Sequence, residues 1–90
     1  MAKTIDAMAL VSNLFHDAVV EGEYVDFYMD SIVTLVLLWD RGGMYAHFRV
    51  QYPGYGATYF RGRYLTAPET EALFPLTERS VGTVKELQQM

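Results

Sequence analysis

The sequence contains no cysteine, only three prolines and only two histidines. Without cysteine there can be no disulfide, no zinc–thiolate site and no thiol catalysis, and the composition fits a reducing, cytoplasmic location, which we expect for this protein. Two histidines are too few for a metal phosphohydrolase, although His16-Asp17 has the dipeptide that such enzymes use. We therefore predict neither a metal site nor a cofactor.

The chain also lacks a long apolar run. The longest, Ser31–Trp39, falls far short of the ~20 residues that a membrane span needs. Lys3 precedes an amphipathic segment rather than the uniform apolar stretch of a secretory signal. We expect a soluble protein with no membrane partner.

Charges of one sign are rare or absent in two parts of the chain. Residues 1–40 contain Lys3 as their one basic residue against seven acidic ones, and residues 41–65 contain four arginines and no acid, within a net charge of −4. Such segregation has two interpretations: the zones compensate each other across the fold, or one of them faces a charged partner.

A β-hairpin is the clearest structural prediction. Ser31–Asp40 is an apolar run rich in β-branched residues, Arg41-Gly42-Gly43 supplies turn residues, and Met44–Tyr52 alternates apolar and polar side chains. This pattern predicts a buried strand, a tight turn and a half-buried partner strand. We expect Ser31–Asp40 to be interior scaffold with no surface role.

The other segments predict a small α+β domain spanning residues 1–90. Thr4–Glu21 has the spacing of an amphipathic helix, with Thr4 or Asp6 as its cap. Tyr24–Met29 fits either an edge strand or a helix, and we prefer the strand. Thr58–Leu65 reads as a third long strand, in which Gly62 indicates a bulge or a close backbone approach.

The C-terminal third predicts one or two short helices. Thr66 and Glu69 have the spacing of a capping box that opens one helix, and Pro75 ends it. Leu76-Thr77-Glu78 is predicted to begin the last helix, with Val84 and other apolar residues on one side. The predicted fold is an N-terminal helix packed on a three- to four-stranded antiparallel sheet, followed by these helices.

The polar face of the second and third long strands is the first candidate binding surface. Its expected members are Tyr45, His47, Arg49, Gln51, Tyr59, Arg61 and Arg63. Tyrosine and arginine are enriched at interface hot spots because they bury apolar area while forming hydrogen bonds. The same mixture suits single-stranded nucleic acid, and it also suits a solvated face on which arginine stems cover rings. The acidic net charge makes direct nucleic-acid binding the weakest of these predictions.

An acidic segment is the second candidate surface. It consists of Asp17, Glu21, Glu23, Asp26 and Asp30, with no basic residue among them. Asp17 and Glu21 share a helix face, where like charges cost a few tenths of a kcal/mol. This arrangement fits a basic partner, such as a nucleic-acid-binding protein, or a solvated acidic surface.

Catalytic patterns are weak. His47 becomes a general base only beside a carboxylate, the serines stand in no nucleophile-elbow context, and the glycine-rich turns lack the spacing and lysine of a phosphate loop. We predict a protein that is not an enzyme.

The order helix–three strands–helices in a small acidic chain resembles some phage-encoded anti-CRISPR inhibitors, which block a nuclease by occupying its nucleic-acid groove. The resemblance concerns architecture alone and implies a protein-binding inhibitor or adaptor of a nucleic-acid-processing host protein. Two alternatives remain: a homo-oligomeric structural subunit, such as a homodimer, joined through an edge strand or the aromatic face, and a small-ligand or nucleic-acid binder. The binder would use Tyr45, Arg49, Tyr59, Arg61 and Arg63.

Overall fold

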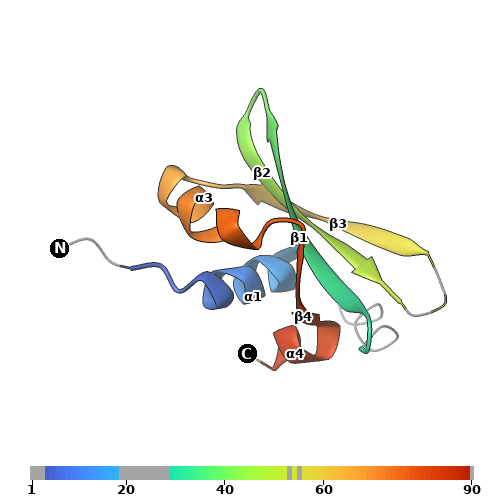
Figure 1. Cartoon of the computed structure of the whole chain (residues 1–90). Coiled ribbons are helices and arrows are strands. Elements are labelled where there is room, and N and C mark those ends of the chain that lie inside the picture. The colour runs from blue at the N-terminus through green and yellow to red at the C-terminus, as the bar shows by residue number, and fades with distance from the viewer. Residues whose placement is uncertain (1–3, 19–28, 53, 55, 90) are drawn as a thin grey trace.

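The computed structural model describes residues 4–18, 29–52, 54 and 56–89. Its elements are α1 (Ala7–Ala18), β1 (Ile32–Asp40), β2 (Gly43–Gln51), β3 (Ala57–Tyr64), α3 (Ala67–Leu73), the 3-10 turn η1 (Phe74–Leu76), β4 (Arg79–Thr83) and α4 (Val84–Gln88). The strands form one antiparallel sheet in the order β3-β2-β1-β4 (Figure 1). The predicted α+β architecture is confirmed.

The hydrophobic core lies between the helices and one face of the sheet, which we call the covered face. Phe48 of β2 and Phe15 of α1 meet edge to face, with ring centroids 5.4 Å apart. Leu73 of α3 and Leu87 of α4 are fully buried in the same core. All described helices therefore pack on the covered face, and α1 and α3 lie on that side of the sheet in Figure 1.

The N-terminal helix follows the predicted pattern within the described residues. Asp6 caps it, because the Asp6 Oδ1 accepts a hydrogen bond from the Ala9 amide at 3.1 Å. Val11, Leu14 and Phe15 form its buried side. Among the described residues, no helix has both the length and the apolar character needed to cross a membrane.

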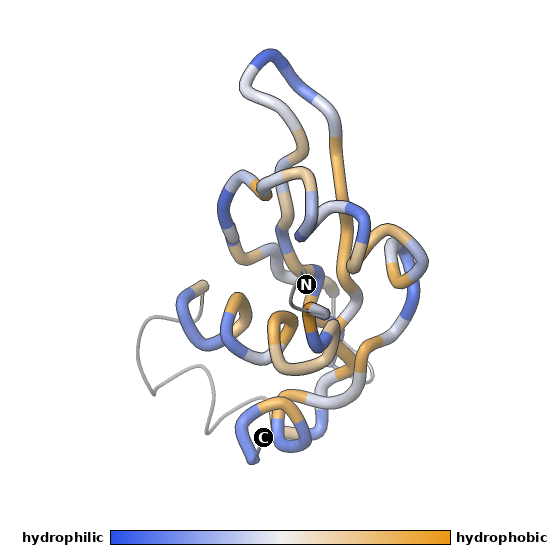
Figure 2. Tube along the Cα trace, turned by 90° about the vertical axis from the view of Figure 1, so that its left-hand side faces the viewer, coloured by the Kyte–Doolittle hydropathy of each residue, from blue (hydrophilic) through white to orange (hydrophobic). Residues whose placement is uncertain are grey.

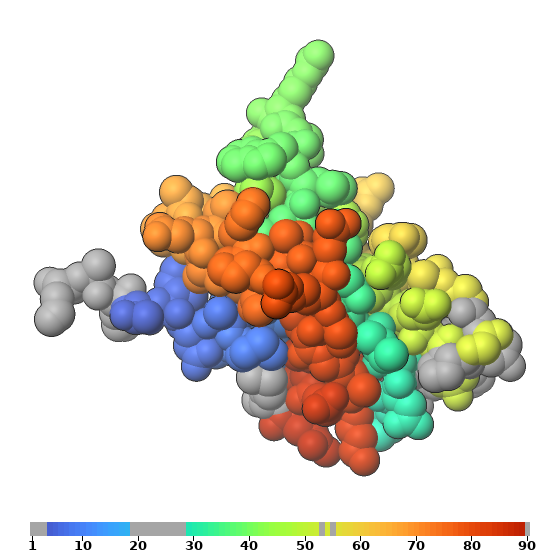
Figure 3. Space-filling view, in the orientation of Figure 1, coloured from blue at the N-terminus to red at the C-terminus, as the bar shows by residue number. Residues whose placement is uncertain are grey.

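The β1–β2 hairpin is confirmed, but β1 is not buried throughout. Val33 and Leu35 are fully buried, whereas Ile32, Leu38 and Trp39 are 49%, 53% and 72% exposed. The end of the hairpin extends beyond the rest of the molecule (Figure 3), and along β1 the hydropathy changes from apolar residues to a hydrophilic tip (Figure 2). Leu38 and Trp39 lie where the hairpin extends beyond the core, and Ile32 lies on the side of the sheet opposite to Val33. The prediction of a strand buried throughout was therefore wrong at these positions.

The fourth strand comes from a segment for which the sequence predicted a helix. Arg79–Thr83 pairs with β1, and the last helix begins at Val84 rather than at Leu76. Gly82 has a φ of 129°, which no helix accepts, and Thr83 forms a capping box with Glu86. The Glu78 amide donates to the Leu35 carbonyl and brings the chain to the β1 edge.

The preferred edge strand at Tyr24–Met29 lies almost wholly outside the described residues. Met29, which is described, lies in a turn before β1. The backbone amide of Lys85 donates to the Met29 carbonyl at 2.9 Å, and that of Val84 donates to the Ser31 carbonyl at 3.0 Å. These bonds join the start of α4 to the turn, so Met29 does not belong to a strand.

Gly62 marks a β-bulge, as its position in the sequence indicated. The pairing passes from Tyr45↔Tyr64 to His47↔Arg61, so that β3 has one more residue than β2 over this stretch. A Cβ atom at Gly62 would overlap the Ala46 carbonyl oxygen of β2. Glycine is therefore required here because the two backbones approach closely.

A candidate binding surface on the outer face of the sheet

The side of the sheet away from the described helices is the outer face. Because directly opposed residues of antiparallel strands point to the same side, the pairing register assigns its members. They are Ile32, Thr34, Val36 and Leu38 of β1, Tyr45, His47, Arg49 and Gln51 of β2, and Tyr59, Arg61 and Tyr64 of β3. The structure thus brings together the predicted Tyr/Arg residues, with one exception.

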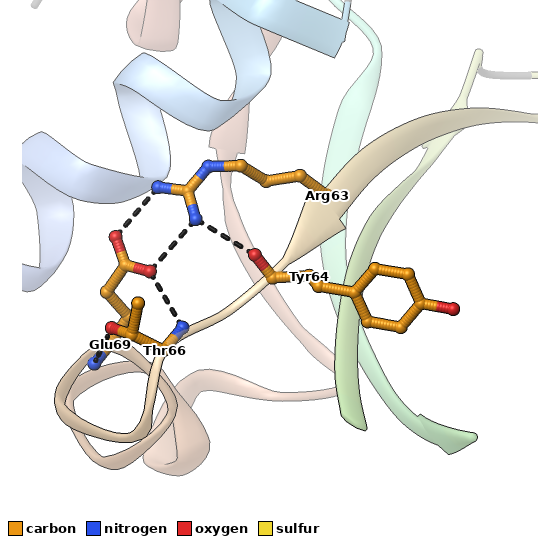
Figure 4. A network of polar contacts seen from close by, with 4 residues as sticks. All are labelled: Arg63, Tyr64, Thr66 and Glu69. Carbon is orange, nitrogen blue, oxygen red and sulfur yellow. Dashed lines mark hydrogen bonds and ion pairs between the residues drawn. The ribbon is translucent and has the colours of Figure 1, made fainter. Parts of the chain in front are cut away.

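Arg63 is that exception, and the bulge at Gly62 is the cause. One extra residue reverses the alternation of side chains, so Tyr64 takes the outer-face position that the sequence assigned to Arg63. Figure 4 shows the Arg63 and Tyr64 side chains leaving the chain in opposite directions. Arg63 points to α3, and its predicted place on the Tyr/Arg surface was wrong.

Arg63 instead forms a two-pronged ion pair with Glu69 of α3. The Arg63 Nη1 and Nη2 atoms donate to the Glu69 Oε1 and Oε2 atoms at 2.9 and 2.7 Å. Glu69 also accepts from the Thr66 amide and completes the predicted capping box. The guanidinium, with smaller contributions from Thr66, lowers the pKa of Glu69 to about 2. This network fastens α3 to β3.

Four rings form an aromatic ladder across β2 and β3. Its members, in order, are Tyr64, Tyr45, His47 and Tyr59, and successive ring centroids lie 5.0, 6.2 and 6.0 Å apart. The Tyr64 hydroxyl donates to the Asp40 Oδ2 at 2.8 Å, which raises the pKa of Tyr64, and the Tyr45 hydroxyl donates to the Gly62 carbonyl. One end of the ladder is therefore held, while Tyr59 at the other end is 60% exposed.

Two arginines flank the ladder. Arg61 lies opposite His47 and is exposed, and Arg49 lies two residues along β2 from His47 and is half-buried. Neither forms an ion pair with a described residue. Burial lowers the pKa of His47 below its ordinary value, so the imidazole is mainly neutral at pH 7 and the two guanidiniums carry the charge of this part of the face.

The acidic segment does not join this surface within the described residues. Asp17 is exposed on α1, which packs on the covered face, and Asp30 is exposed in the turn before β1. Asp17 also raises the pKa of Arg63 through its charge. The remaining predicted members, Glu21, Glu23 and Asp26, lie outside the described residues.

The aliphatic part of the outer face was missed in the sequence. Ile32 and Leu38 belong to a run that reads as buried on both sides, yet each has about half of its surface exposed. Tyr64 was missed because the bulge reverses its direction. Gly62 was the available signal for Tyr64, since a bulge implies this reversal.

The outer face presents aromatic rings, aliphatic side chains and two guanidiniums, which are groups suited to non-covalent binding. In the described part of the chain, no group of three or more histidine, aspartate or glutamate side chains is placed to hold a metal ion. Burial is the cause that lowers the pKa of His47. Comparison of the chain with protein-family models, with curated proteins and with solved structures finds no match.

Proposed function

We propose that the protein is a non-enzymatic binding module that contacts another protein through the outer face of its sheet. The proposal extends to a role as inhibitor or adaptor of a nucleic-acid-processing protein, which the net charge of −4 and the helix–sheet–helix order support. The observation that carries it is the composition of the outer face, where tyrosine and arginine side chains lie beside exposed aliphatic ones.

The aliphatic side chains favour a protein as the partner. Ile32 and Leu38 expose apolar surface. Covering this surface with another apolar surface stabilises a complex by roughly 25 cal/mol per Å² of buried area. Tyr59 and Arg61, which lie on β3 beyond β2 on the same face, are residue types that form interface hot spots. A protein surface can satisfy both kinds of side chain at once.

A capture experiment with matched variants tests this proposal. The tagged chain is used to recover proteins from a host lysate, in parallel with the variants Arg61→Glu, Asp17→Lys and Lys85→Glu. Lys85→Glu makes the same charge change as Arg61→Glu, but on α4 of the covered face. We expect one partner to be captured by the wild-type, Asp17→Lys and Lys85→Glu proteins and to be lost with Arg61→Glu. Loss with Asp17→Lys while Arg61→Glu still binds would assign the contact to the acidic surface and overturn the proposal.

Self-association is a second candidate function, and the exposed end of the β1–β2 hairpin favours it. Trp39 is 72% exposed, and Leu38 beside it is 53% exposed. The β1 edge is paired with β4 from Ile32 to Leu35, and the Leu37 amide donates to the Thr77 Oγ1. The β4 pairing therefore ends before Leu38. Light scattering tests this candidate: a dimer that Trp39→Glu converts to monomer would support it, and a monomeric wild-type protein would exclude it.

A further inference from the structure

The cationic groups of the outer face are placed next to one another. The register puts Arg61 directly opposite His47 and puts Arg49 directly opposite Tyr59, so the two guanidiniums come from diagonal positions on adjacent strands. Diagonal side chains of this kind are within reach of one ligand group. Asp40, the carboxylate at the far end of the face, already accepts from Tyr64 and Gly42.

Arg49 is partly desolvated without compensation. Its Nε atom is buried and has no hydrogen-bond partner among the described residues, and its cross-strand neighbour Thr34 is 7% exposed. A charged donor that has lost water and gained no acceptor raises the free energy of the free protein. An anion bound at the outer end of this guanidinium recovers part of that free energy.

The two halves of the outer face differ in polarity. The β1 column presents Ile32, Val36 and Leu38, which are aliphatic, whereas the β2 and β3 columns present the aromatic ladder and the two guanidiniums. A ligand that covers the whole face must therefore carry apolar groups on one side and anionic groups on the other.

We infer that the outer face binds an acidic, partly aliphatic peptide segment of the protein partner, with Arg49 and Arg61 holding its carboxylates and Ile32 and Leu38 contacting its aliphatic side chains. This inference rests on the proposed function and names the chemistry of the partner. Guanidinium–carboxylate pairing is directional and strong for a hydrogen bond. The aromatic ladder shares β2 and β3 with the two arginines and supplies flat rings for contact.

A single-stranded nucleic acid fits the same face less well. It carries one negative charge per nucleotide and binds through several cations, whereas this face offers two guanidiniums on a chain of net charge −4. It also has no aliphatic surface to cover Leu38 and Ile32. Charge and apolar exposure together therefore favour the peptide.

An NMR titration of the isotope-labelled full chain tests the inference at low ionic strength. The probe is a short acetylated and amidated peptide of aspartate, leucine and glycine; the controls are the same peptide with asparagine for aspartate and an oligothymidine of the same length. We expect saturable shifts at the Arg49 and Arg61 Nε–H groups and in the β2 and β3 amides with the aspartate peptide. The asparagine peptide should bind about tenfold more weakly, as the loss of one charged hydrogen bond predicts.

Variants then separate charge from folding. Arg61→Gln should weaken binding of the aspartate peptide about tenfold, and Arg61→Lys should restore part of it. Arg79→Gln is the matched control, because Arg79 lies opposite Leu35 of the covered face, and it should leave the affinity unchanged. Arg61 is exposed, so its replacements should leave the amide spectrum of α1 unchanged.

Three results would overturn the inference: no saturable shift, equal binding of the asparagine peptide, or tighter binding of oligothymidine. None of these affects the capture experiment with Arg61→Glu, so the proposed function can stand when the inference fails. If Arg61→Glu retains the captured partner while the peptide still binds at Arg61, the proposed function fails and the peptide site remains.

Discussion

The two faces of the sheet are built from the same strands but differ in what their side chains contact. On the covered face, Val33, Leu35 and Phe48 are fully buried against three helices. On the outer face, Ile32, Tyr59 and Arg61 are exposed. Alternating side chains of one strand therefore serve either the core or the exposed surface. Substitutions one residue apart should differ in how much they lower the free energy of unfolding.

The largest effect should come from the covered face. Phe48→Ala removes a fully buried ring that meets Phe15, and we expect a loss of about 3–5 kcal/mol in the free energy of unfolding. Tyr59→Ala on the outer face should cost less than about 1 kcal/mol. Urea denaturation measures both values, and equal losses would contradict the separation of the two faces.

A substitution at the bulge of β3 should cause the next largest loss in the free energy of unfolding. Gly62→Ala forces a Cβ atom against the Ala46 carbonyl oxygen, and we expect a loss of about 2 kcal/mol. Gly56→Ala is the matched control because, apart from its chain neighbours, no atom of the described residues comes within 4 Å of its Cβ position. Thermal denaturation compares the two variants. A Gly62→Ala protein as stable as the control would show that the close approach is not required.

Arg63 should contribute to stability rather than to binding. Arg63→Gln removes the ion pair with Glu69, and we expect a loss of about 1 kcal/mol at pH 7, because both side chains retain solvent contact. The pKa of Glu69 falls from 4.5 to about 2 on folding. As the pH is lowered, the Glu69 carboxylate is therefore protonated first in the unfolded chain, and the stabilisation by the ion pair is lost between pH 4.5 and about 2.

Stability curves of the wild type and Arg63→Gln should therefore converge as the pH falls from 4.5 toward 2. Curves that stay parallel over this range would contradict the assignment of the ion pair. Arg63→Gln should also capture the partner as the wild type does. Loss of the partner would return Arg63 to the binding surface.

The smallest effect concerns His47. Burial lowers its pKa below 6.5, so at acidic pH the unfolded chain binds the proton more readily than the folded protein does. The contribution to stability is complete above pH 6.5 and decreases as the pH falls below that value. His47→Gln should flatten this part of the stability curve, and NMR titration of the ring checks the pKa directly. A pKa above 6.5 would contradict the half-buried position.

The hairpin, the capping box of α3 and the covered face could be predicted because each depends on a local pattern. Alternation along Met44–Tyr52 assigns Phe48 and Val50 to the core, and the spacing of Thr66 and Glu69 specifies the helix start. These features need no knowledge of distant segments.

The wrong predictions concern residues whose conformation depends on distant partners. Arg79–Thr83 becomes a strand because the β1 edge accepts it, although the pattern of Val81, Val84 and Leu87 resembles a helix. Trp39 is exposed because the hairpin extends beyond the helices, which hydropathy along the strand cannot indicate. The reversed directions of Arg63 and Tyr64 could have been predicted, since Gly62 already indicated a bulge.

The central claim is that the outer face of the sheet is the binding surface, and an NMR footprint of the captured partner tests it most directly. Unlabelled partner is added to the isotope-labelled chain, and the amide and side-chain signals are compared by face. We predict that the affected signals cluster at Tyr45, His47, Tyr59 and Arg61, and that α1 and α4 stay unchanged. A footprint on α1 and α4 with an unchanged outer face would contradict the claim.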